Sequence, residues 1–145
     1  MTLSIEAAVR GVADTLREKV APTLTDSFAT EVTRLSTHLL TIMANAADDA
    51  VALRVEENAR VRTLLGDGAA VVGDTVLAAR LAQAAASTDP GFRISELDRE
   101  TDRLRRLLVE LQVALELQDD VACRTLNQRI WSLLRDIETS RAPRL

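Results

Sequence analysis

The chain has 145 residues, of which 47% are hydrophobic, 28% charged and 2% aromatic, and its net charge is −4. This length predicts one domain, residues 1–145, with a core of its own, and it excludes two ordinary domains. Five glycines and three prolines are too few for the many turns of an all-β fold. Because binding to phosphates requires a concentrated basic surface, the acidic balance argues against a nucleic-acid partner.

The compartment is indicated by the cysteine content and by the amino terminus. Cys123 is the only cysteine, so the chain has no internal disulfide and fits a reducing cytosol. Glu6 interrupts the segment where a signal peptide needs an unbroken apolar run, and no run approaches ~18 apolar residues. Basic residues are almost all arginine, which is typical of GC-rich bacterial coding. We expect a bacterial, cytoplasmic protein that does not bind membranes.

Apolar residues spaced by three and four positions predict a first helix over residues 2–21. Pro22 ends this helix, because proline pushes the residue before it out of the helical region. Thr25 or Asp26 then caps a second helix. The apolar stripe of this second helix has a strict four-three rhythm and consists of Phe28, Val32, Leu35, Leu39, Ile42 and Ala46.

The second helix is expected to be unusually long. No helix breaker occurs before Gly66, so it could run for about 40 residues. Beyond Ala46 the apolar stripe drifts around the helix towards Val61 and Leu64. Such a drift is produced by a bend or stutter, and we predict a break or kink within residues 45–49.

Glycine-containing segments predict a turn at residues 66–68 and a loop at residues 87–93, with a short helix between them that ends near Ala86. Ser95 is the expected cap of the fourth helix, with Asp98 as its reciprocal partner. The stripe of this fourth helix consists of Leu97, Thr101, Leu104, Leu108, Leu111 and Leu115.

Asp119 or Asp120 caps a last helix, and residues 140–145 form a frayed tail. These elements predict an all-α fold: four or five helices in a mostly antiparallel bundle. A seam on the fourth helix is expected to form the core or an interface; it consists of Leu97, Leu104, Leu107, Leu108 and Leu111. Leu107 widens this seam beyond what one neighbour needs, so we also expect a homo-oligomer, most simply a dimer.

His38 is the only histidine, so a di-iron site, which needs Glu-x-x-His pairs on two helices, is excluded. Cys123 with His38 is the only conceivable thiol nucleophile pair, but a small buried or half-buried residue is the simpler interpretation of Cys123. We expect no catalytic residue, metal or cofactor. The alternative is a pocket between helices that uses His38, Glu31 or Arg34.

Two further residues have two interpretations each. Glu57 belongs either to a solvated, ion-paired face with Arg60 or to a partly buried site where it pairs with an arginine. Trp131 lies at the edge of the last helix's stripe, where it either covers the bundle rim or binds a partner.

Residues 55–62, with the sequence Val-Glu-Glu-Asn-Ala-Arg-Val-Arg, and residues 97–108 resemble small, uncharacterised helical bacterial proteins. Proteins of this kind are similar to proteins whose genes lie beside the genes of acyl-CoA dehydrogenase-like and kinase-like phosphotransferase enzymes. The resemblance implies an accessory role and supplies no catalytic residue.

The sequence therefore predicts a non-catalytic helical interaction or oligomerisation protein, an accessory subunit of a bacterial cytoplasmic enzyme or complex. The alternative is a small-ligand-binding bundle, or an enzyme with a pocket between helices that draws on Glu31, Arg34, His38 or Trp131.

Overall fold

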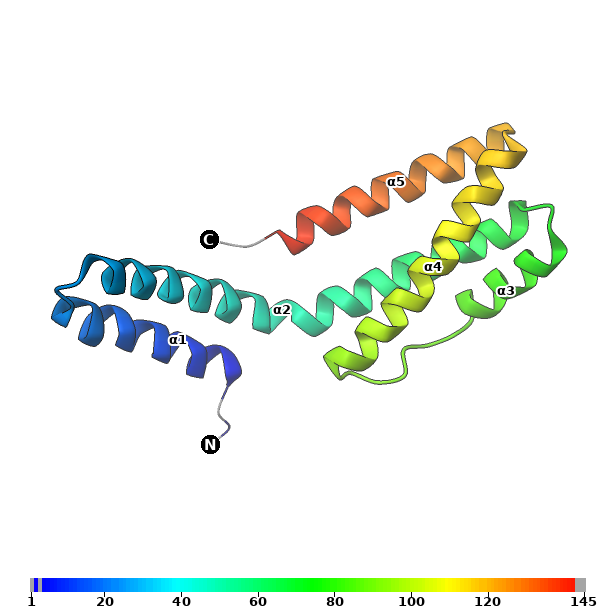
Figure 1. The fold of residues 1–145 in the computed structure, drawn as a ribbon. Coiled ribbons are helices and arrows are strands. Elements are labelled where there is room, and N and C mark those ends of the chain that lie inside the picture. Colours follow the sequence, from blue (N-terminus) through cyan, green and yellow to red (C-terminus); the bar gives the residue numbers. More distant parts are fainter. Residues whose placement is uncertain (1, 3, 143–145) are drawn as a thin grey trace. The chain divides into compact units, whose positions relative to one another are not determined.

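The computed structural model describes residue 2 and residues 4–142. These residues form five α-helices and no strand, so the predicted all-α class is confirmed (Figure 1). The helices are α1 (Ile5–Thr15), α2 (Ser27–Val71), α3 (Thr75–Ala85), α4 (Ile94–Gln118) and α5 (Val121–Arg141). Contacts divide the chain into two compact units: unit 1 runs up to Ala50, and unit 2 is Val51–Ala142. The single domain over residues 1–145 stays a prediction.

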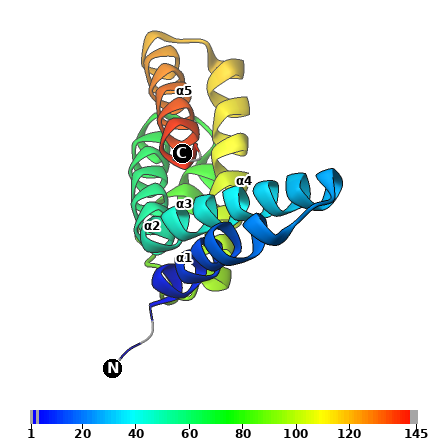
Figure 2. The same cartoon turned by 90° about the vertical axis from the view of Figure 1, so that its left-hand side faces the viewer.

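Unit 1 is a hairpin of α1 and the first part of α2, which run side by side (Figure 2). α1 begins at Ile5 and continues as a π-helical turn, Leu16–Val20, and a 3-10 turn, Ala21–Thr23, that contains Pro22. Asp26, one of the two predicted caps, accepts a hydrogen bond from the Ala29 backbone N–H at 2.7 Å. The carboxylate thereby satisfies one of the free amide groups at the start of α2.

α2 has 45 residues, which agrees with the predicted length. The helix is continuous through residues 45–49, where the sequence predicts a break or kink. The boundary between the two units follows directly, at Ala50. In spite of this length, α2 and the other described helices lack the apolar run that a bilayer-crossing helix needs.

The predicted turn at residues 66–68 is wrong, because these residues belong to α2. Gly68 is a packing residue: a Cβ built on it would lie only 2.6 Å from one methyl carbon of Leu111. The absence of a side chain therefore lets α4 approach α2 closely. The chain turns instead at residues 72–74, where Asp74 caps α3 by accepting hydrogen bonds from the Val76 and Leu77 amides.

The start predicted for α4 is also wrong. The helix begins at Ile94, and the Glu96 carboxylate accepts a hydrogen bond from the Arg93 backbone N–H, so Ser95 already lies within the first turn. α4 ends at Gln118 and is followed by Asp119, which has a left-handed conformation with φ 45°. Asp120 caps α5 by accepting a hydrogen bond from the Cys123 N–H at 2.8 Å. Residues 140 and 141 of the predicted frayed tail are helical, and residues 143–145 lie outside the described residues.

The core of unit 2 is built by all four of its helical segments and consists of aliphatic side chains, small alanines and Cys123. The seam predicted on α4 is buried inside this unit: Leu97, Leu104, Leu107, Leu108 and Leu111 are at most 8% exposed. Four of these leucines, Leu104, Leu107, Leu108 and Leu111, belong to one core cluster with residues of α2, α3 and α5, which gives the helices their mutual packing.

We expect Gly68→Ala to destabilise the protein by about 1–3 kcal/mol, because Leu111 is fully buried and must shift to make room for the new methyl group. Gly66→Ala is the matched control: its Cβ would meet only Ala85, at 3.4 Å, so the variant should gain up to about 1 kcal/mol from helix propensity. Urea unfolding measures both. Equal effects of the two substitutions would contradict the packing role of Gly68.

Candidate functional site

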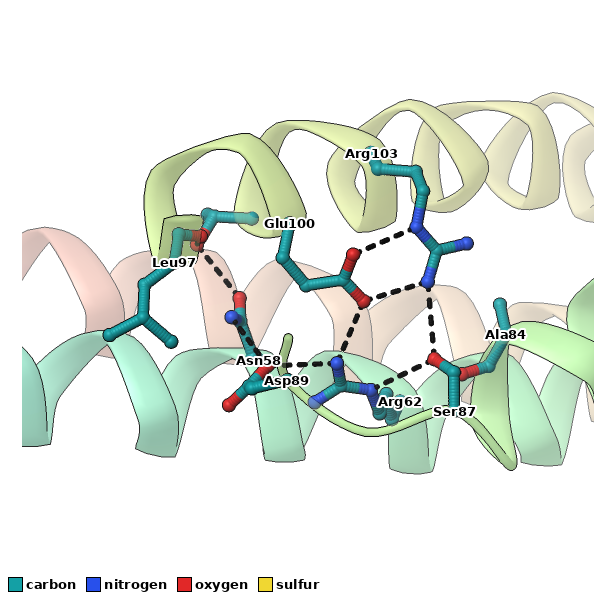
Figure 3. A network of polar contacts seen from close by, with 9 residues as sticks. Asn58, Arg62, Ala84, Ser87, Asp89, Leu97, Glu100 and Arg103 are labelled. Carbon is teal, nitrogen blue, oxygen red and sulfur yellow. Dashed lines mark hydrogen bonds and ion pairs between the residues drawn. The ribbon is translucent and has the colours of Figure 1, made fainter. Parts of the chain in front are cut away.

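Unit 2 contains a buried polar network that joins α2, the loop at residues 87–93 and α4 (Figure 3). Its members are Asn58, Arg62, Ser87, Asp89, Glu100, Thr101 and Arg103. Asn58 and Arg62 lie one turn apart on α2, next to Val61 and Leu65. The face of the helix that buries these apolar residues therefore also buries the two polar side chains.

Arg62 is the centre of this network. Its Nη2 donates to Asp89 Oδ1 at 2.8 Å and to Glu100 Oε1 at 2.7 Å. Arg103 binds the same Glu100 carboxylate through two nitrogens, at 2.9 and 2.7 Å. The hydrogen bonds of Arg103 and then of Arg62 hold the pKa of Glu100 below its ordinary value. The buried carboxylate is therefore ionised at neutral pH.

Asn58 is fully buried and uses both ends of its amide. Its Nδ2 donates to Asp89 Oδ1 at 3.0 Å, and its Oδ1 accepts from Thr101 Oγ1 at 2.8 Å. Within the described part of the chain, every buried side-chain nitrogen and oxygen has a hydrogen-bond partner. The network thus pins the loop through Asp89 and leaves none of its buried polar atoms free for a ligand.

Glu57 forms a second buried ion pair, which also ties helices together. It is 3% exposed, accepts from Arg105 Nε at 2.7 Å, and also binds Arg141. The solvated-face interpretation is therefore wrong for Glu57, and the buried pairing with arginine is what the structure contains. The physical reason is that Glu57 lies one turn before Val61 on the core-facing side of α2.

An open hollow of about 560 Å³ lies beside the buried polar network. It is lined by Arg62, Thr63, Ser87, Thr88 and Asp89, among others. The charge of Arg62 is already balanced by Asp89 and Glu100, so the hollow offers a ligand no uncompensated charge from this arginine.

Unit 1 has its own hollow, of about 410 Å³, between α2 and the π-helical and 3-10 turns that follow α1. Its lining includes Arg17, Arg34, His38 and four threonines of α2. Glu31 binds Arg34 through two hydrogen bonds of 3.0 and 2.6 Å, and this contact lowers the pKa of Glu31. The three candidate residues Glu31, Arg34 and His38 thus lie along one helix, with Arg34 and His38 on the same hollow.

Trp131 belongs to unit 2 and is 55% exposed on α5. The shallow hollow around it is formed by residues of α5 alone: Gln128, Ser132 and Arg135. A single helix face of this kind presents an aromatic surface and encloses no small molecule.

Cys123 is fully buried in the core of unit 2. Burial, and after it the hydrogen bond with the Asp120 carboxylate, raises the pKa of this thiol, although a position near the start of a helix generally lowers the pKa of a cysteine. Among the described residues, no three His, Cys, Asp or Glu side chains are grouped closely enough to hold a metal ion.

The most exposed apolar surface of unit 1 is a row of side chains on α2, which we call the unit 1 stripe. It consists of Phe28, Val32, Leu35, Leu39 and Met43, which are between 44 and 77% exposed. Thr37 and Ala44, which are buried in the hairpin, lie on the opposite side of α2, about 140–160° around the helix from the middle of the stripe. α2 therefore packs on α1 with its small and polar side and leaves its apolar side uncovered.

Sequence reasoning predicted no site at the buried polar network, and in particular it missed Asn58, Arg62 and Asp89. A signal for two of them was present: Asn58 and Arg62 fall among the apolar positions of α2, where a polar side chain must find a partner. No such signal exists for Asp89, because its place under Arg62 depends on how the loop folds back.

We expect Glu100→Gln to lower the free energy of unfolding at pH 7 by about 3 kcal/mol, because it leaves Arg62 and Arg103 without the charge that they share. The folded-state pKa of Glu100 is lowered, so its stabilising effect is present above its ordinary value of 4.5 and is lost as the pH falls below it. The difference between variant and wild type should therefore shrink below about pH 4.5 in urea unfolding.

Glu110→Gln is the matched control, because Glu110 forms an exposed pair with Arg80 and should leave stability nearly unchanged. A Glu100→Gln protein as stable as the wild type at pH 7 would contradict the role given to the buried polar network.

Comparisons with protein-family models, with curated proteins and with solved structures found no match.

Proposed function

We propose that this protein is a non-catalytic helical interaction module that forms homodimers, and that it serves as an accessory subunit of an enzyme or complex in the bacterial cytoplasm. One observation carries this proposal: the unit 1 stripe is apolar and exposed, although it has the regular spacing of a helix that packs against another helix.

The poor burial of unit 1 supports the same conclusion. Among its described residues, only Ala13, Thr37 and Ala44 are buried. Ordering a residue costs about 1–2 kcal/mol of backbone entropy, and two buried alanines offset little of that cost. A hairpin of this kind is stabilised when a further apolar surface covers it, which favours association as part of the protein's normal state.

The polar groups of unit 2 support a structural rather than a chemical role. Glu57 and Glu100 are each bound by two arginines, so both carboxylates serve to hold helices together. The accessory role comes from the resemblance in residues 55–62 and 97–108 to small helical bacterial proteins.

We expect the wild-type chain to have twice its monomer mass in light scattering at tens of micromolar. A Leu35→Asp/Leu39→Asp variant should be monomeric, because each leucine contributes about 1.5–3 kcal/mol of burial and each counts twice in a symmetric dimer, which weakens association at least ~100-fold. Far-ultraviolet circular dichroism should show that the variant stays helical, since both positions are exposed within the chain.

Val113→Asp is the matched control, since Val113 is similarly exposed, on α4 of unit 2, and should leave the mass unchanged. A wild-type protein that is monomeric at 100 µM would rule out the proposed function.

A second candidate function, the binding of a small anionic ligand, is favoured by the unit 1 hollow, whose lining includes Arg17, Arg34 and His38. Asp14 and Glu31 pair with the two arginines, but these pairs are exposed and therefore weak, so an anion can compete for the arginines, unlike for the buried Arg62. His38 is the only histidine, so its ring protons are a unique signal in the proton magnetic resonance spectrum. If this function is correct, inorganic phosphate should shift these signals in the wild type, at least tenfold more weakly in Arg34→Gln, and as in the wild type in Arg80→Gln of unit 2. An unchanged His38 signal at millimolar phosphate would reject phosphate as the ligand.

A further inference from the structure

We infer that two copies of this chain pair antiparallel along the first part of α2, with Leu35 of one copy packed on Leu39 of the other. This inference rests on the proposed self-association and names the surface, the partner and the direction of pairing. The partner is a second copy, and the surface is a stripe of six positions in four-three rhythm. It consists of Phe28, Val32, Leu35 and Leu39 of the unit 1 stripe, the half-buried Ile42, and Ala46, and Met43 borders it.

The spacing of the stripe is symmetric about its own midpoint. From Phe28 to Ala46 the steps are four, three, four, three and four residues, which read the same in both directions. Two such helices laid antiparallel therefore place an apolar residue opposite an apolar residue at every level. This self-complementarity is what a two-fold interface requires.

Side-chain sizes favour the antiparallel over the parallel direction. The antiparallel register places Phe28 opposite Ala46, Val32 opposite Ile42, and Leu35 opposite Leu39. The total side-chain volume then varies less from level to level than in a parallel pair, so the helices can remain at a more even distance. A parallel pair would place two phenylalanines together at one end and two alanines at the other, which requires overpacking or a void.

Charge favours the same direction. The positions that border the stripe, residues 29, 31, 36, 38, 43 and 45, contain one fully charged side chain, Glu31. A parallel pair would bring the two Glu31 carboxylates to the same level. The antiparallel pair separates them to opposite ends of the interface, where each keeps its own Arg34 at 2.6 Å.

The area is sufficient for a specific dimer. Each large side chain of the stripe contributes on the order of 100 Å² of exposed apolar surface, so five of them give about 500 Å² per chain and about 1,000 Å² for two. That area reaches the lower limit of specific interfaces, and it matches the largest apolar patches that monomers expose.

Disulfide trapping of full-length chains tests the register. In a Cys123→Ala background, which removes the native thiol, one chain carries Phe28→Cys and another carries Ala46→Cys. We expect oxidation of the mixture to join the two different chains in at least tenfold excess over either self-linked product, while Val76→Cys, an exposed site on α3, forms no cross-link. Circular dichroism confirms that each variant remains helical.

Spin labels on Ala46→Cys provide a second measurement that tolerates a weakened interface. The antiparallel register separates the two labels by about 27 Å along the helix axis, whereas a parallel pair would place them at the same level. Self-linked Phe28→Cys chains, or labels within about 15 Å, would overturn the antiparallel pairing.

The remaining outcomes separate this inference from the proposed function. A dimer that Leu35→Asp/Leu39→Asp leaves intact but Val113→Asp dissociates would overturn the inference and keep the proposed self-association. A monomer whose melting temperature falls on substitution of the stripe would show that the chain covers the stripe itself, and would overturn both.

Discussion

The architecture of unit 2 depends on the requirement that a buried carboxylate be paired. Glu57 of α2 is bound by Arg105 of α4 and Arg141 of α5, and Glu100 of α4 is bound by Arg62 of α2. A slide of one helix by a single turn, about 5.4 Å, would separate these partners and leave buried charges uncompensated. The ion pairs therefore constrain the register of the helices together with the aliphatic packing, of which the close approach of Leu111 to Gly68 is one contact.

α2 serves two environments with one continuous helix. In unit 2 its core-facing side carries polar and apolar residues together, and all are enclosed by α3, α4 and α5. In unit 1 the same helix uses threonine and alanine against α1 and exposes its most apolar side. The drift of the apolar pattern after Ala46 marks this change of neighbours in the sequence.

The helical class and the length of α2 could be predicted, and the caps Asp26 and Asp120 were each one of two neighbouring candidates, because these features depend on residues close together in the chain. The helical course of residues 66–68 could not be predicted, because glycine suits both a turn and the close approach of a neighbouring helix. Only the position of Leu111 in the structure distinguishes these two roles. The burial of Glu57 was one of two interpretations that the sequence left open, and the role of Asp89 was missed. Both carboxylates pair with arginines that the fold brings from distant segments of the chain.

The position of Trp131 has a spectroscopic consequence. It is the only tryptophan in a chain without tyrosine, and it lies half in solvent on α5. Its fluorescence in the native protein should already resemble that of a hydrated indole, so denaturation changes the emission little. A molecule that binds to this side of α5 would instead shift the emission of Trp131 to shorter wavelengths. Binding at that surface can therefore be measured with the native chain, without an added label.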